Sequence, residues 1–158
     1  MAAATIFSTQ MTAITGNTGG GIQSLPNVTA VNGTKKNFHA DITFASQVAG
    51  TTIGIARLPL GAMITGIQIL TDTSTGSTTL SIGDSNSAAL YAAAAAYTTT
   101  NAPQRVGLAA TMGVPITSGY DCVTNTASKS YEDIVVVTAA ATAPASGNLR
   151  IDIEYVID

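Results

Sequence analysis

Catalytic chemistry in this chain would have to centre on His39, because it is the only histidine. Asp41 follows two residues later, and residues i and i+2 of a β-strand lie on one face, so the two side chains can approach each other. Such a pair serves as a general base only beside a nucleophile. Gly83–Ser87 lacks the final glycine of a Gly-x-Ser-x-Gly elbow. We therefore interpret His39 and Asp41 as a surface pair and expect no enzymatic activity.

Metal and cofactor motifs are equally sparse. One histidine and one cysteine, Cys122, cannot form the cluster that transition metals prefer, and a single cysteine permits no intrachain disulfide. The glycine-rich stretch 16–21 lacks the Lys-Ser/Thr of a phosphate-binding loop. We expect no catalytic residue, no cofactor and no metal site. A calcium ion bridging loops is the weaker alternative, at Asp72, Asp84 or Asp121.

Paired carboxylates that act as general acid and base stay open as an alternative, because two such groups need only meet in space. The aromatic content argues against a sugar-binding cleft of this kind. The chain has no tryptophan, and aromatic residues make up only 5% of it. A cleft that stacks sugar rings is therefore disfavoured.

The charge content is low for a soluble domain. Only 9% of the 158 residues are charged and the net charge is −3, against about 25% charged residues in ordinary domains. A surface so poor in charge permits close association, so we expect much of it to be covered in an assembly. The six basic residues are scattered and only Lys35 and Lys36 adjoin, which argues against nucleic-acid binding. No apolar run reaches the ~18 residues of a membrane span.

Short segments of period-two hydrophobicity, separated by turn residues, predict β-strands. The clearest is the C-terminal one, where Leu149, Ile151 and Ile153 alternate with Arg150 and Asp152. A one-residue slip would bury those charges, so its register should be firmly set. The other strand segments are expected at 38–44, 51–58, 63–69 (Met63, Thr65, Ile67 and Ile69 on one face), 78–83 (Leu80 and Ile82 inward) and 131–139.

One segment has a helical composition instead. Ser87–Tyr97 is rich in alanine, the best intrinsic helix former, and Asp84 to Asn86 could cap its start. The sequence thus predicts a mainly β fold, an antiparallel β-sandwich or jelly-roll with one short Ala-rich helix.

The N-terminal segment differs from the rest. Residues 1–34 contain no charged side chain and have too few apolar residues for a core of their own. We predict two parts, an extended N-terminal arm over 1–37 and a β-sandwich domain over 38–158. A disordered tail is the alternative for the arm. Contacts with neighbouring copies or partners are expected from Ile6, Phe7, Met11, Ile14, Lys35, Lys36, Tyr91 and Tyr97.

Three stretches resemble a family of small virion proteins of tailed bacteriophages, described as capsid decoration (cement) or head structural proteins. The stretches are IARLPLGAMITGIQI at 55–69, TTLSIGDSNSAALYAAA at 78–94 and LRIDIEYVID at 149–158. In that family an A-R-L-P-x-G-A turn precedes a strand, a second strand ends in Gly-Asp, and a hydrophobic strand closes the chain. Residues 1–54 match nothing in it.

The resemblance implies a homo-oligomer, a trimer, on the outer surface of the phage head, where it bridges neighbouring major capsid proteins. The chain would then be made in the host cytoplasm and located in the virion. Avidity from repeated weak contacts would hold it there. A tail or head-fibre component is the runner-up, and a carbohydrate-binding module is a weaker alternative.

Overall fold

The computed structural model describes residues 35–107, 109–122 and 126–157, and these form β-strands joined by turns. The described residues contain no helix, and so none that could cross a membrane. The mainly β, antiparallel class predicted from the sequence is confirmed. The strands are β1 (Lys36–Thr43), β2 (Thr52–Pro59), β3 (Ala62–Thr71), β4 (Thr79–Gly83), β5 (Ala92–Ala95), β6 (Gln104–Arg105), β7 (Gly119–Asp121), β8 (Thr126–Lys129), β9 (Tyr131–Ala139) and β10 (Asn148–Ile157).

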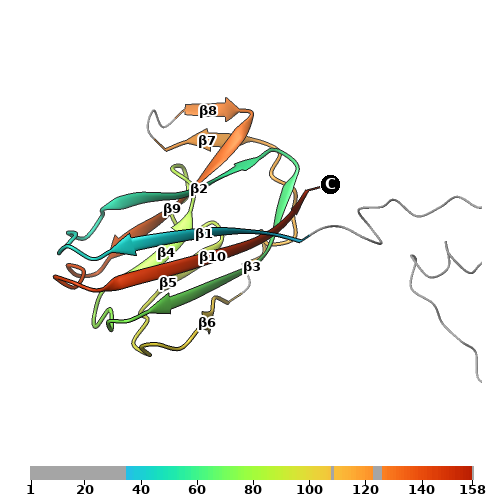
Figure 1. The fold of residues 1–158 in the computed structure, drawn as a ribbon. Helices are drawn as coiled ribbons and strands as arrows, with labels where there is room; N and C mark the ends of the chain where they lie inside the picture. Colours follow the sequence, from blue (N-terminus) through green and yellow to red (C-terminus); the bar gives the residue numbers. More distant parts are fainter. Residues whose placement is uncertain (1–34, 108, 123–125, 158) are drawn as a thin grey trace, which may run out of the picture.

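Eight of these strands form a jelly-roll. One sheet has the order β1-β10-β3-β6 and the other β2-β9-β4-β5 (Figure 1). The antiparallel pairs are nested along the chain: the first strand pairs with the last, and each later pair lies inside the one before. The pairs are β1–β10, β2–β9, β3–β6 and β4–β5. The chain is therefore one long hairpin, with its tip at β4–β5, rolled into two layers. The remaining hairpin, β7–β8, is inserted between β6 and β9.

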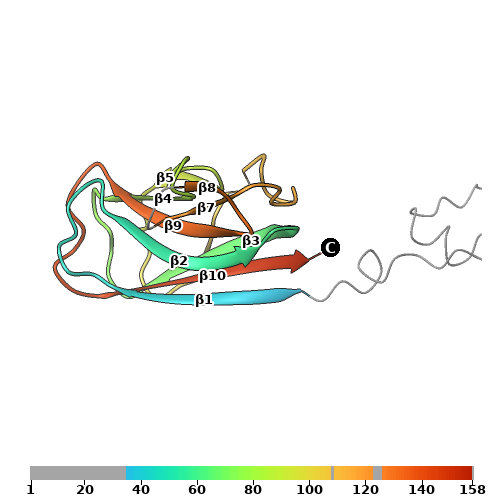
Figure 2. The ribbon, with the colours of Figure 1, turned by 90° about the horizontal axis from the view of Figure 1, so that it is seen from above.

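The core lies between the two layers, which Figure 2 shows from the side. Alternate residues of each strand point inwards, and burying each large aliphatic side chain contributes about 1.5–3 kcal/mol. The predicted inward rows of the fourth and last strands, Leu80 with Ile82 and Leu149 with Ile151 and Ile153, are confirmed. The other large aliphatic side chains that are fully buried in this core are Leu58, Ile64, Ile69, Ile134 and Val136.

The predicted face of β3 is wrong in its first half. Ala62 and Ile64 are buried, whereas Met63 and Thr65 are only half-buried. The cause is a bulge: Glu154 of β10 pairs with Gly66 and Tyr155 pairs with Ile64, so Thr65 is an extra residue. An extra residue reverses the alternation on one side of it, and the prediction held only for Ile67 and Ile69.

The Ala-rich helix predicted over Ser87–Tyr97 is also wrong, because Ala92–Ala95 form β5. Tyr91 and Tyr97 are both buried in the core. Between them, β5 pairs antiparallel with β4, with Ala92 opposite Ile82 and Ala95 opposite Leu80. Tertiary packing of the two rings therefore overrides the helix propensity of alanine.

The segment before β5 folds back against the end of β4. Asp84 accepts hydrogen bonds from the backbone N–H groups of Asn86 (2.8 Å) and Ser87 (2.5 Å), so it caps a turn and not a helix. A Cβ atom on Gly83 would lie 1.9 Å from the carbonyl oxygen of Ser87. Only glycine permits this close approach of two backbone segments.

The predicted division into an arm and a sandwich domain stays a prediction. β1 begins at Lys36, and residues 1–34 lie outside the described residues.

Replacing Gly83 with alanine should destabilise the fold by roughly 2–4 kcal/mol, because backbone must move to admit the methyl group. Gly107→Ala is the matched control, since a Cβ there meets no atom within 4 Å. Urea unfolding of the two variants measures the difference. Equal unfolding midpoints would contradict the close packing around Gly83.

Candidate functional site

Most charged groups on the outer face of the first sheet are paired across β1 and β10. Lys35 Nζ lies 2.7 Å from Glu154, and Arg150 Nε donates to Asp41 at 3.0 Å. These hydrogen bonds lower the pKa values of both carboxyl groups. Exposed pairs of this kind contribute little to stability, because solvent and salt screen them. They do cancel one another's charge, so this face presents little net field.

His39 lies within the same network. Its Nδ1 atom is 2.7 Å from Asp152 and its Nε2 atom is 3.1 Å from Asp41. The approach of His39 to Asp41, expected from their spacing, is confirmed. The hydrogen bond with Asp152 raises the imidazole pKa, so protonation of the ring is favoured. Because each ring nitrogen is hydrogen-bonded to a carboxylate, the arrangement is that of a surface ion pair and not of a base that activates a nucleophile.

A second polar cluster attaches the β7–β8 hairpin to the second sheet. Arg57 of β2 donates two hydrogen bonds to Asp133 of β9, at 2.6 and 2.9 Å, and its guanidinium lies 3.8 Å above the ring of Tyr131. Asp133 also accepts the backbone N–H of Cys122, at 3.1 Å. The Tyr131 hydroxyl donates to Asp121 at 2.7 Å. The guanidinium holds the pKa of Asp133 low, and burial raises that of the Cys122 thiol.

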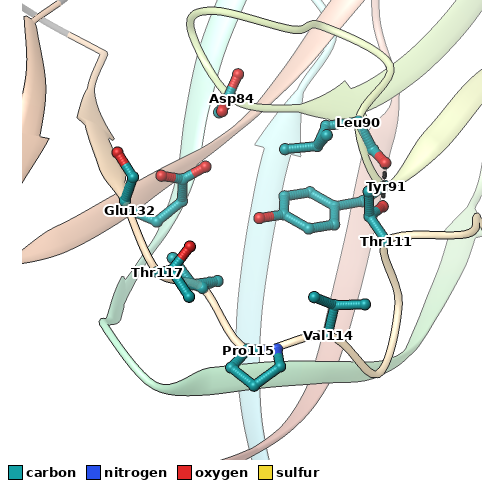
Figure 3. A pocket seen from close by; sticks show the side chains of 10 residues that line it. Asp84, Leu90, Tyr91, Thr111, Val114, Pro115, Thr117 and Glu132 are labelled. Carbon is teal, nitrogen blue, oxygen red and sulfur yellow. Dashed lines mark hydrogen bonds between the residues drawn. The ribbon is translucent and has the colours of Figure 1, made fainter.

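A cavity of about 170 Å³ lies between β4, β9 and the segment 111–118. Figure 3 shows Glu132 and Asp84 on one side of it and the Tyr91 ring beside them, with its hydroxyl directed towards Glu132. The opposite wall is apolar and includes Val114 and Pro115. Thr111 closes the rim by donating a hydrogen bond to the carbonyl oxygen of Leu90.

Glu132 and Asp84 are both buried, with 1% and 5% of their surface exposed. The carboxyl of Glu132 accepts the backbone N–H of Tyr120 at 2.8 Å. Burial, reinforced by the carboxyl of Asp84, raises the pKa of Glu132 to about 7. Burial also raises the pKa of the Tyr91 hydroxyl. Glu132 is therefore neutral in mildly acidic solution and can share a proton with its neighbour.

Glu132 and Asp84 are the kind of carboxyl pair that could act as general acid and base, the alternative left open by the sequence. Ligand pockets usually measure about 300–1,000 Å³, and the cavity here is smaller than that range. All buried side-chain polar atoms of the described residues have hydrogen-bond partners. We interpret the pair as a satisfied internal contact that joins β9 to the turn after β4.

The residues considered for calcium do not come together. Asp72 accepts the backbone and side-chain N–H groups of Asn148, at 2.7 and 2.9 Å. Asp84 caps its turn, and Asp121 accepts the hydroxyl of Tyr131. Within the described part of the chain, no three His, Cys, Asp or Glu residues gather around a position for a metal ion.

The residues predicted to make interfaces fall into three groups. Tyr91 and Tyr97 lie in the chain's own core, 4% and 5% exposed, so their rings are not available to a partner in this fold. Lys35 and Lys36 are exposed at the start of β1. Ile6, Phe7, Met11 and Ile14 lie outside the described residues.

Sequence reasoning missed Glu132 and Arg57. The signal for Glu132 was a carboxyl group two residues before the apolar run 134–137, where a charge that becomes buried needs a partner. Nothing in the sequence pointed to that partner, since Asp84 is 48 positions away.

Because the fold raises the pKa of Glu132, the neutral form of this carboxyl group stabilises the fold. The contribution is complete at pH values below the ordinary pKa of glutamate, and it is lost as the pH rises through about 7. We therefore expect the free energy of unfolding to fall between about pH 5 and about pH 8. Glu132→Gln cannot ionise and should remove most of this fall. Glu154→Gln, a surface control, should retain it. Urea unfolding across this pH range measures both, and an unchanged slope in Glu132→Gln would contradict the assignment.

Comparison with solved structures finds the same fold in bacteriophage capsids. A chain in the capsid asymmetric unit of cyanophage Pam1 is 22% identical and superposes with a TM-score of 0.56, over 80% of this chain and 86% of that one. A chain in the capsid of Ralstonia phage GP4 is 17% identical, with the same TM-score and the same coverage. No family model and no curated protein matches the sequence. The shared property is thus the jelly-roll fold, in two chains that belong to phage capsids.

Proposed function

We propose that this chain is a virion structural protein, a capsid decoration (cement) protein on the outer surface of a phage head that bridges major capsid proteins. The observation that carries the proposal is the jelly-roll shared with chains of two phage capsids over 80% of this chain. Two features of the chain support a structural role.

First, the described residues hold no arrangement that favours catalysis. His39 is clamped between carboxylates at the surface, and the buried carboxyl pair faces a cavity too small for an ordinary ligand. The polar clusters hold strands together and do not converge on an open site. A role in assembly fits this arrangement better than a reaction does.

Second, the surface suits repeated protein contacts. Only 9% of residues are charged, and several of the exposed charges cancel in pairs such as Lys35 with Glu154 and Arg150 with Asp41. A neighbouring protein that covers such a surface has few unpaired charges to desolvate. Many weak contacts repeated over a particle then hold by avidity.

We further propose that the chain is a homotrimer and that the uncharged residues 1–34 contact a partner. In a closed three-fold ring every copy uses the same two patches, one towards each neighbour, so all three interfaces are identical. Because the arm has no charged side chain, it can contact a partner without burying a charge of its own.

The copy number per virion tests the proposed role. A decoration protein should occur in a fixed ratio to the major capsid protein, whereas a tail or head-fibre component should occur in far fewer copies. Quantitative mass spectrometry of purified particles, with the major capsid protein as internal standard, gives the ratio. A low copy number, or absence from emptied heads, would refute the assignment to the capsid surface.

The oligomer and the arm are tested together. Light scattering at micromolar concentration should give three times the mass of one chain. Deletion of residues 1–34 should reduce occupancy on particles that lack the protein by about tenfold or more, while the urea midpoint changes little. A monomer mass would count against the trimer, and full occupancy without the arm would count against its contact role.

A further inference from the structure

The four edges of the jelly-roll differ in how well they are protected. Each sheet has two outer strands: β1 and β6 in one, β2 and β5 in the other. The outer side of an edge strand carries unpaired N–H and C=O groups that can pair with another chain, and proteins usually blunt such edges.

Three of these edges are blunted. β6 has two residues and β5 has four, too short to template a strand of useful length. β2 is longer, but a bulge between Gly54 and Ala56 breaks its regular register and Pro59 ends it without an N–H group. Bulges, prolines and short length are the usual devices against edge-to-edge pairing.

β1 has none of these devices. It runs for eight residues, contains no proline and keeps one register with β10 from Lys36 to Thr43 without a bulge. Of its charged residues, Lys36 lies at the first position of the strand, whereas His39 and Asp41 contact Asp152 and Arg150 of β10. The charge of the latter two is therefore directed towards that neighbour and not across the edge. Among the described residues, no strand pairs with its other side.

The inward row of β1 is also incompletely covered. Phe38, Ala40 and Ile42 pack against the core but are only half-buried, unlike their cross-strand partners Ile153, Ile151 and Leu149. Apolar surface left exposed along an open edge is stabilised when another strand covers it. The β1 edge is therefore suited to receive an extended, uncharged segment.

We propose that residues Thr5–Thr9 of a second copy of this chain add as a strand to the free edge of β1. The segment lies in the uncharged residues 1–34 and contains Ile6 and Phe7. Because neighbouring side chains of a strand point to opposite faces, one of the two must lie beside the half-buried row of β1 in any register. Strand addition gives affinity through the backbone and needs no charge complementarity.

The length of the arm permits this exchange between copies. Thirty-four residues span up to ~110 Å when extended, whereas β1 measures roughly 27 Å. The inference rests on the proposed function in one respect: it requires copies to lie side by side, as in a trimer. It adds to that function a named donor segment and a named acceptor edge.

Amide hydrogen exchange on the full-length protein tests the pairing. In the wild-type oligomer the amides of β1 that point away from β10 should be protected. The double variant Ile6→Asp, Phe7→Asp should speed their exchange by about tenfold or more. The control Asn17→Asp, Thr18→Asp adds the same charge to the arm outside the donor segment and should leave β1 unchanged. The proposal is overturned if β1 exchanges at the same rate in all three proteins.

Disulfide trapping then identifies which copy donates the segment. In a Cys122→Ser background, a chain with Phe7→Cys is mixed in turn with chains that carry one cysteine at each position of β1, because the register of the added strand is not fixed. At least one mixture should form a cross-linked dimer. If disulfides form only when both cysteines are in one chain, the chain's own arm covers its β1 edge and the exchange is overturned. No disulfide at any position would also overturn it.

Failure of this inference is distinguishable from failure of the proposed function. If β1 becomes protected only on the particle, and the Ile6 and Phe7 variant leaves that protection intact, a capsid protein covers the edge and strand exchange is wrong while the capsid role stands. If wild-type protein shows the exchange but does not occur on particles, the capsid role is wrong and the exchange stands.

Discussion

The fold depends on the double ladder made by β10. This strand pairs with β1 on one side and with β3 on the other along nearly its full length. Leu149, Ile151 and Ile153 point into the core, while Arg150 and Asp152 point out and pair with residues of β1. A shift of one residue would bury the charges and expose the aliphatic row, so the apolar and ionic patterns specify one register. Because β1 and β10 are the first and last strands of the rolled hairpin, this register fixes how the two halves of the chain close on each other.

Strands with clear alternation could be predicted from the sequence, because burial on one face leaves a period of two in the residues. This holds for β1, for Leu80 and Ile82 of β4, and for β10. It fails where the backbone departs from regular geometry. The extra residue at Thr65 reverses the alternation of β3, and the turn at Gly83 and Asp84 carries the alanine segment into a strand. Helix propensity is a local quantity, and the burial of Tyr91 and Tyr97 is a tertiary one that outweighs it.

The candidate sites were less predictable than the strands. The contact of His39 with Asp41 follows from strand geometry, but the additional carboxylate of Asp152 comes from a strand more than a hundred positions away. Arg57 and Asp133 are likewise far apart in the sequence, by 76 positions, and Glu132 and Asp84 by 48. Polar groups of this kind satisfy one another inside or across layers, and only the topology brings them together. The topology itself, two sheets formed from one rolled hairpin, is not encoded in any local pattern.

We propose that this sparsely charged jelly-roll functions by being covered by other proteins on a phage head. A cryo-electron microscopy map of the intact particle is the decisive measurement. We expect jelly-roll density on the outer surface of the head, around local three-fold axes and in contact with more than one major capsid protein. A map in which the head surface carries no such density, or in which the fold occurs only in the tail, would contradict it.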